Sequence, residues 1–246
     1  MKRIAFFFLT LAFASAAVSC NDTDVDQAHH TSFVTVHQTL SVEGYYFETD
    51  NGKTIFPGDT SRIGAYQATE GQRALIAFNL LDNMPGYDYN AAIYGIGHIS
   101  SADVCVVTDE AELIAMKNDP IIEIDGRLLG DWITVVIRHQ ANTTDALKHE
   151  FAMFLNEVVP STDEEKEDSY EIPTTEDPEV LTLQLRHKNL EETVQGYFYD
   201  RYYSFNVEEI VNRFEGKKKI EVCYYDGTEW KTVELRWLKE SDPETL

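Results

Sequence analysis

Two turn sequences, Asn51-Gly52 and Asp226-Gly227, most strongly limit the folds open to this chain. Asn-Gly and Asp-Gly pairs favour the left-handed backbone of two-residue hairpin turns, which join neighbouring antiparallel strands. Each pair lies between short stretches rich in aromatic and β-branched residues, a composition typical of strands. Because the two hairpins lie far apart in the sequence, we expect a chain that is mainly β from one end to the other.

The first part of the chain, residues 32–107, is predicted to be a small β-barrel domain. Strands are expected over residues 33–40, 45–47, 53–56, 72–81, 89–99 and 102–107. This many short strands in so short a stretch suits a partly open barrel such as an OB-fold. Residues 108–119 are predicted to be a linker that contains a short helix, ended by Asn118-Asp119-Pro120 because proline disfavours helix at the preceding residue.

The second part, residues 120–238, is predicted to be an antiparallel β-sandwich. Strands are expected over residues 121–124, 132–138, 149–159, 180–186, 196–205, 219–225 and 229–237. Val207–Phe214 has the apolar spacing of a helix packed on a sheet, with Asn206 as its cap and Gly216 as its stop. The acidic residues 160–178 are predicted to be an insertion, and residues 239–246 a polar tail.

The N-terminus resembles a bacterial lipoprotein signal. Lys2 and Arg3 precede an apolar run that is too short to span a bilayer, which takes about 20 residues. Ala17-Val18-Ser19-Cys20 resembles a lipobox, so residues 1–19 are predicted to be a signal peptide and Cys20 the site of lipid attachment. The alternative is a cut after Ala16, which fits the small-x-small rule and gives a secreted protein.

Residues 20–31 are predicted to be an acidic tether. Acidic residues directly after the lipid-bearing cysteine resemble the surface-export signal of bacteroidete lipoproteins, which favours an outer-membrane lipoprotein exposed at the cell surface. In other Gram-negative lineages early aspartates act differently, so a periplasm-facing or secreted protein is the alternative. The membrane is therefore an expected partner, reached through the lipid.

The charge balance excludes some partners. The chain has 43 Asp and Glu against 20 Lys and Arg, a formal net charge of −23. A field of that sign repels phosphate backbones, so no nucleic acid is expected as a partner. Cys105 and Cys223, the cysteines beyond Cys20, are candidates for a disulfide in an oxidising compartment or for buried positions in strands.

Taken together, these features resemble those of the NigD-like lipoproteins. The resemblance is carried by Cys20 with its acidic tether, Tyr45–Phe47, Asp50–Pro57, Glu70–Arg73, Met84–Tyr89, Asn118–Ile121 and Leu185–Asn189. It implies an N-terminal OB-like domain, a C-terminal β-sandwich, and an immunity or accessory role associated with a bacteriocin. The family has no established catalytic residue, so the resemblance assigns none here.

Catalytic motifs do not stand out in the sequence. There is no Gly-x-Ser-x-Gly, no Cys-x-x-Cys and no His-Glu-x-x-His, so no catalytic residue and no cofactor are predicted. His139, His149 and His187 lie at the ends of predicted strands and are weak candidates for zinc ligands if they meet. The alternative function is accordingly an envelope hydrolase with a metal or carboxylate site in the second domain.

Binding is the more strongly indicated function. OB-like barrels bind oligosaccharides or extended chains across one face, and Tyr45, Tyr46, Tyr87 and Tyr89 are candidates for stacking on such a ligand. The alternative is that these tyrosines pack across strands. We therefore expect a non-enzymatic envelope protein that binds a protein or glycan partner.

Overall fold

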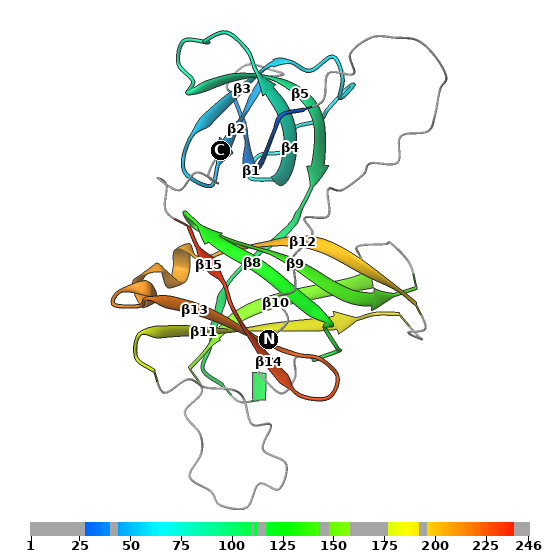
Figure 1. Cartoon of the computed structure of the whole chain (residues 1–246), viewed down its shortest axis with the longest axis vertical. Helices are drawn as coiled ribbons and strands as arrows, with labels where there is room; N and C mark the ends of the chain where they lie inside the picture. Colours follow the sequence, from blue (N-terminus) through cyan, green and yellow to red (C-terminus); the bar gives the residue numbers. More distant parts are fainter. Residues whose placement is uncertain are drawn as a thin grey trace, which may run out of the picture.

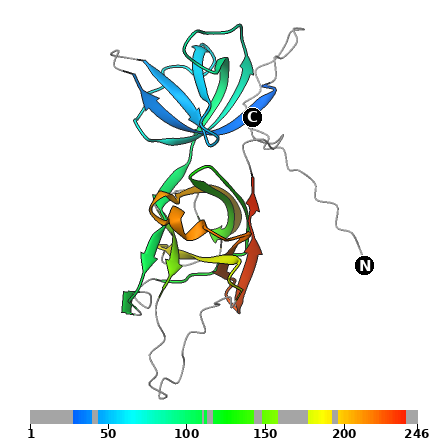
Figure 2. The same ribbon diagram turned by 90° about the vertical axis from the view of Figure 1, so that its left-hand side faces the viewer.

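The computed structural model describes residues 28–39, 44–109, 111–112, 117–142, 148–157, 177–191 and 196–238. It consists of a closed β-barrel at one end and a two-sheet β-sandwich at the other (Figures 1 and 2). The predicted fold class, an OB-like barrel followed by a β-sandwich, is confirmed. The predicted signal peptide, Cys20, the 239–246 tail and nearly all of the 160–178 insertion lie outside the described residues. No helix in the described part is long and apolar enough to cross a membrane.

The barrel closes in the order β1-β2-β3-β5-β4. Its strands are β1 His30–Gln38, β2 Tyr45–Thr49, β3 Thr54–Asp59, β4 Arg73–Leu80 and β5 Tyr89–His98. Alternate residues of β1 and β2, such as Val34, Val36 and Phe47, are fully buried in the barrel core, as the two-residue period of a strand requires. Gly52, at φ 74°, makes the predicted turn between β2 and β3.

The sandwich packs two five-stranded sheets around one core. One sheet has the order β14-β13-β11-β10-β7 and the other β15-β8-β9-β12-β6. The strands of these two sheets that follow β7 in the chain are β8 Glu123–Leu129, β9 Trp132–Ala141, β10 His149–Asn156, β11 Val180–Asn189, β12 Tyr197–Asn206, β13 Lys219–Tyr225, β14 Trp230–Glu234 and β15 Arg236–Trp237. The core residues alternate along the facing strands, as in the run Ile133, Val135 and Ile137 of β9.

The barrel ends earlier than the sequence indicates. β6 Ser100–Asp103 and β7 Cys105–Val107 leave the barrel, and each joins a different sheet of the sandwich. β6 pairs in parallel with β12, and β7 pairs in parallel with β10. The predicted boundary at residue 107 is therefore too late, since the local pattern of a strand does not tell which sheet it joins.

The predicted helix over Val207–Phe214 forms as the 3₁₀ helix η2, Glu208–Phe214. The N-cap of this helix is Val207, which makes no side-chain capping hydrogen bond, so the predicted cap at Asn206 is one residue too early. The Asn206 side chain still accepts a hydrogen bond of 2.7 Å from the backbone N–H of Glu208. Ile210 is buried, whereas Val211 is 55% exposed. The apolar contact with the sandwich is therefore narrower than the sequence spacing predicts.

The possible disulfide between Cys105 and Cys223 does not form. Both are free thiols, with Cys105 exposed on β7 and Cys223 buried on β13. β10 and β11 lie between β7 and β13 in the sheet, which separates the two cysteines by roughly 14 Å at the usual strand spacing. A disulfide needs Cα atoms within about 7 Å.

Side chains from both domains meet where the barrel joins the sandwich. The Arg73 guanidinium on β4 lies 4.2 Å from the centre of the Trp132 ring on β9. The Phe33 ring on β1 lies 4.9 Å from the Arg127 guanidinium and 5.4 Å from the Tyr202 ring. These contacts hold the barrel against the β8-β9-β12 face of the sandwich.

Candidate functional site

A continuous row of ring side chains crosses the outer face of the barrel. His37 of β1 stacks on Tyr46 of β2 at 5.1 Å between ring centres. Tyr87, in the loop before β5, lies 5.8 Å from Tyr46 and 5.2 Å from Phe56 of β3. We call these four residues the aromatic row. It follows from the strand period, because Phe47 and Ile55 point into the core and their neighbours point outward.

The structure divides the four predicted tyrosines between two environments. Tyr46 and Tyr87 share the aromatic row. Tyr45 instead packs edge-on against Phe47 and Tyr66, and Tyr89 packs against the barrel core. The two-residue period around Phe47 was the signal that could have separated Tyr45 from Tyr46, and that could have added Phe56 to the row.

Hydrogen bonds to carboxylates fix both ends of the aromatic row. His37 Nδ1 lies 2.8 Å from Glu70 Oε1, and its Nε2 lies 3.4 Å from Glu48. The backbone N–H of Gln38 also donates to Glu70, and with His37 it lowers the pKa of that carboxyl below its ordinary value. The ring of His37 is therefore oriented before any ligand arrives.

The loop that carries Tyr87 is held in a similar way. Asp88 accepts hydrogen bonds from the Thr54 backbone N–H at 2.9 Å and from the Thr54 hydroxyl at 3.0 Å. These bonds lower the pKa of the Asp88 carboxyl. The contact ties the start of β3 to the loop, and so keeps the Tyr87 ring against Phe56.

The aromatic row lies where OB-folds bind extended ligands. That face is formed by strands 2 and 3 together with the loops between strands 1 and 2 and between strands 4 and 5. The loop between β4 and β5 also exposes apolar side chains, with Leu81 43% and Met84 37% accessible. Aromatic faces bordered by carboxylates can stack on a sugar ring and accept its hydroxyls, or pack against a polypeptide.

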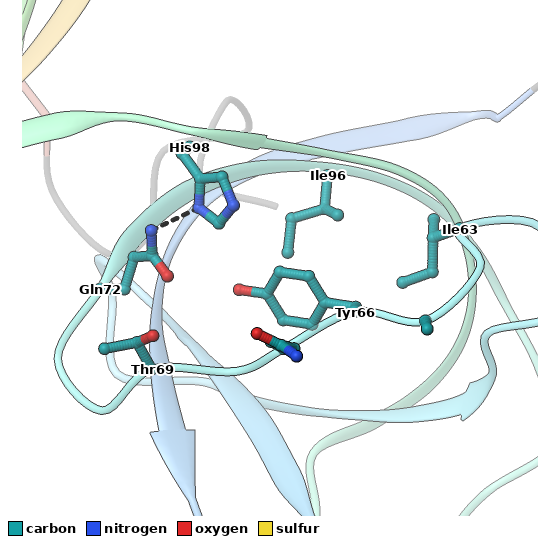
Figure 3. Close-up of a pocket in the computed structure, with 8 residues that line it drawn as sticks. Ile63, Tyr66, Thr69, Gln72, Ile96 and His98 are labelled. Carbon is teal, nitrogen blue, oxygen red and sulfur yellow. Dashed lines mark hydrogen bonds between the residues drawn. The ribbon is translucent and has the colours of Figure 1, made fainter.

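A hollow lies at the mouth of the barrel, beneath the loop that joins β3 to β4 (Figure 3). It has a volume of about 520 Å³ and is lined by Ile63, Ala65, Tyr66, Gln67, Thr69, Gln72, Ile96 and His98. Gln72 and His98 hydrogen-bond to each other at one side of it. The Tyr66 hydroxyl is buried in its wall without a hydrogen-bond partner among the described residues, and that burial raises the pKa of Tyr66.

The structure brings the three candidate histidines together inside the sandwich. The ring centre of His139 lies 4.5 Å from that of His149 and 5.4 Å from that of His187, and His149 and His187 are 5.2 Å apart. They come from the ends of β9, β10 and β11, and each is at most 4% exposed. We call them the histidine cluster.

Two of the three rings in the histidine cluster are joined by a hydrogen bond. His187 Nδ1 lies 3.2 Å from the Pro120 carbonyl oxygen, so it must donate the proton. His187 Nε2 then accepts from His149 Nδ1 at 2.9 Å. Burial, helped by the neighbouring His149, lowers the pKa of His139 and that of His187 to about 4, so both rings are neutral at pH 7.

This arrangement of hydrogen-bonded rings does not form a metal centre. Within the described ranges, no set of three or more His, Cys, Asp or Glu side chains has the arrangement of a metal site. Both nitrogens of His187 are already engaged, and the Phe151 ring stacks on it at 4.6 Å. The cluster also lies in the core between two sheets, where each ring is at most 4% exposed.

A known family model matches the barrel domain. Residues 33–99 match the family model of the NigD-like N-terminal OB domain. No curated protein sequence matches the chain.

Solved structures share the fold over both domains. A protein of unknown function from Bacteroides vulgatus is 18% identical, with a TM-score of 0.63, over 88% of this chain and 93% of its own. A putative lipoprotein from Bacteroides fragilis is 14% identical, with a TM-score of 0.56, over 85% of this chain and 98% of its own. A NigD-like immunity protein from Bacteroides caccae is 18% identical with a TM-score of 0.54 over 83% and 90%.

Proposed function

We propose that this chain, whose N-terminal domain is a NigD-like N-terminal OB domain, is a lipid-anchored protein of the bacterial envelope. It binds a protein or glycan partner and catalyses no reaction. The anchor is Cys20, and the acidic residues behind it hold the two domains away from the membrane, at the outer surface of the cell.

The aromatic row is the observation that carries the binding proposal. Four rings from β1, β2, β3 and the loop before β5 form one contiguous surface on the face that OB-folds use for ligands. Two carboxylates, Glu70 and Asp88, hold the ends of this surface in place. Preorganised rings lose little conformational freedom on binding, which favours affinity.

We propose that this binding serves an immunity role. The structure from Bacteroides caccae is that of a NigD-like immunity protein, and an anchored binder at the cell surface is placed to meet a toxin before it reaches the membrane. The partner is then a bacteriocin or a component of its export machinery.

The proposal is tested by capture from the envelope. The purified chain is incubated with a glycan array and, separately, with cross-linked envelope extract from the producing cells. Wild type is compared with Tyr46→Ala and with a matched control, Tyr94→Ala, which removes a half-buried tyrosine of β5 outside the aromatic row. We expect one partner to be captured by wild type and by Tyr94→Ala and lost with Tyr46→Ala. Equal capture by all three would reject the aromatic row as the binding surface.

A further inference from the structure

One strand of the sandwich is left with half of its edge open. β12 pairs with β9 along its whole length, Tyr197 to Asn206. On its other side, β6 pairs only with the last four residues, Tyr203–Asn206. Within the part of the chain that the structure describes, no strand therefore lies beside Tyr197–Tyr202 on that side.

The direction of the backbone groups along this edge follows from two hydrogen bonds. The Asn206 carbonyl accepts from Val104 N–H on the β6 side, and Val207 N–H donates to the Asp131 carbonyl on the opposite side. Because successive residues of a strand point their backbone groups to alternate sides, Phe198 and Asp200 present their N–H and C=O groups to the open edge, and Tyr202 presents its N–H. The Tyr202 carbonyl faces Ser100, where the parallel pairing with β6 begins. Their neighbours in β12 complete the ladder with β9.

Other sheet edges in the sandwich carry the usual protection against pairing. β14 has Lys231, held by Asp226 and Glu229, and the open start of β8 carries Glu123 and Asp125. Lysines, like-charged residues and prolines discourage a further strand from adding. The stretch from Tyr197 to Tyr202 has no lysine and no proline.

Exposed rings lie on this edge instead. Phe198 is 60% exposed and Tyr202 36%, and both lie on the same face of β12 as Asp200. Arg138 holds Asp200 through two hydrogen bonds of 2.8 and 3.0 Å, and it also lies 3.5 Å from Glu123. Two carboxylates thus share one guanidinium, which leaves a net negative charge between two apolar side chains.

We propose that the open edge of β12 binds an extended segment of a partner polypeptide, which adds as a further strand beside Phe198, Asp200 and Tyr202. The segment has a basic residue opposite Asp200 and apolar residues two positions to each side. Backbone hydrogen bonds supply affinity in this mode, and alternate side chains supply specificity. Opposite charges and apolar rings facing each other across two strands stabilise the pairing, and the net charge of −23 favours a basic segment.

The test uses the whole chain and a synthetic peptide of five residues, with valine at the first and last positions, lysine at the third and threonine at the second and fourth. This peptide spans Phe198 to Tyr202 and stops before Tyr203, which is paired with β6. Amide hydrogen exchange is followed by NMR at millimolar peptide. We expect exchange at Phe198, Asp200 and Tyr202 to slow at least about tenfold, with Tyr199 and Arg201, already paired to β9, unchanged. The same peptide with glutamate in place of lysine should protect several-fold less.

Four variants test whether the binding is specific to this edge. Phe198→Thr should weaken the protection, whereas Tyr197→Thr should not, since Tyr197 is 77% exposed but lies on the opposite face of the strand. Asp200→Lys should reverse the preference toward the glutamate peptide. Tyr46→Ala should leave the binding intact, because the aromatic row lies on the other domain.

Three results would overturn the proposal. The first is no protection by the lysine peptide at millimolar concentration. The second is equal protection by the lysine and glutamate peptides. The third is protection of these amides in the free chain that rises with protein concentration, which would mean that a second copy of the chain occupies the edge.

Discussion

The Arg73 guanidinium lies 2.6 Å from the Asp50 carboxylate, and both side chains are almost completely buried where the barrel meets the sandwich. Arg73 also donates to the Thr35 hydroxyl at 3.0 Å and packs on the Trp132 ring of the other domain. Burial works against both charges: it raises the pKa of Asp50 and lowers that of Arg73, while each partner opposes the shift of the other. The pair therefore depends on both members being present.

Removing one member of this pair should be costly. Arg73→Met leaves the Asp50 carboxylate buried without its cation, which typically destabilises a protein by about 3–5 kcal/mol. Urea unfolding followed by circular dichroism measures the loss. The double variant Arg73→Met/Asp50→Asn should recover most of it, and a double variant as unstable as Arg73→Met would contradict the account.

The contact between the domains can be tested at a glycine. Gly130 has φ 55°, and a Cβ there would lie 2.0 Å from the Asp50 carbonyl oxygen. Gly130→Ala should therefore destabilise through backbone strain and through a clash with the barrel. Gly52→Ala is the matched control, because Gly52 has φ 74° but nothing within 4 Å of its Cβ. We expect Gly52→Ala to cost about 1 kcal/mol, the strain alone, and Gly130→Ala clearly more; equal losses of unfolding free energy would argue against the domain contact.

The histidine cluster predicts a loss of stability in mild acid. His139 and His187 have pKa values of about 4 in the folded protein, against an ordinary value of 6.5. Between pH 4 and pH 6.5 the unfolded chain therefore binds more protons than the folded protein does. The contribution of these histidines to the free energy of unfolding is complete above pH 6.5 and is lost as the pH falls toward 4. Each group contributes up to about 3 kcal/mol. Arg201, Asp119 and His149 act on the same rings.

Urea unfolding at pH 7 and pH 5 measures this dependence. His139→Phe keeps a ring against Phe151 but removes one titrating group, so its stability should change less between the two pH values. His98→Gln, at an exposed position of the barrel, is the matched control and should behave as wild type. A His139→Phe variant with the full pH dependence would show that acid acts elsewhere, on the many carboxylates.

Much of the fold follows from local pattern. Asn51-Gly52 and Asp226-Gly227 locate both hairpins, and the strand-end positions of His139, His149 and His187 were enough to suggest that they meet. What the sequence does not carry is which strands pair over long distances. Ser100–Val107 reads as strand whichever sheet it joins, and the contact between Arg73 and Trp132 depends on the docking of two domains.

Only part of the candidate site could be predicted, again because the local sequence does not show which strands pair over long distances. Tyr46 and Tyr87 were picked for their chemistry, and the strand period around Phe47 distinguishes Tyr46 from Tyr45. His37 has no such local signal, because its place in the aromatic row comes from pairing opposite Tyr46 across β1 and β2. Its partner Glu70 lies 33 positions away in the sequence.

The anchor is tested by Cys20→Ala. Without the thiol no lipid is attached, so the protein should move from the membrane fraction to the soluble fraction with an unchanged unfolding temperature. Several acyl chains make the wild-type attachment lasting, and it should resist a high-salt wash. If the variant still sediments with membranes after that wash, the lipid interpretation is wrong. Protease treatment of whole cells then tells the outer surface from the periplasm.

The most direct measurement is the dissociation constant of the captured partner for wild type, Tyr46→Ala and Tyr94→Ala. The aromatic row predicts that Tyr46→Ala raises the dissociation constant at least about tenfold, a loss of about 1.4 kcal/mol. Tyr94→Ala should stay within about twofold of wild type, and both variants should keep the wild-type unfolding free energy within about 1 kcal/mol. Equal dissociation constants for all three proteins would contradict a binding function for this face of the barrel.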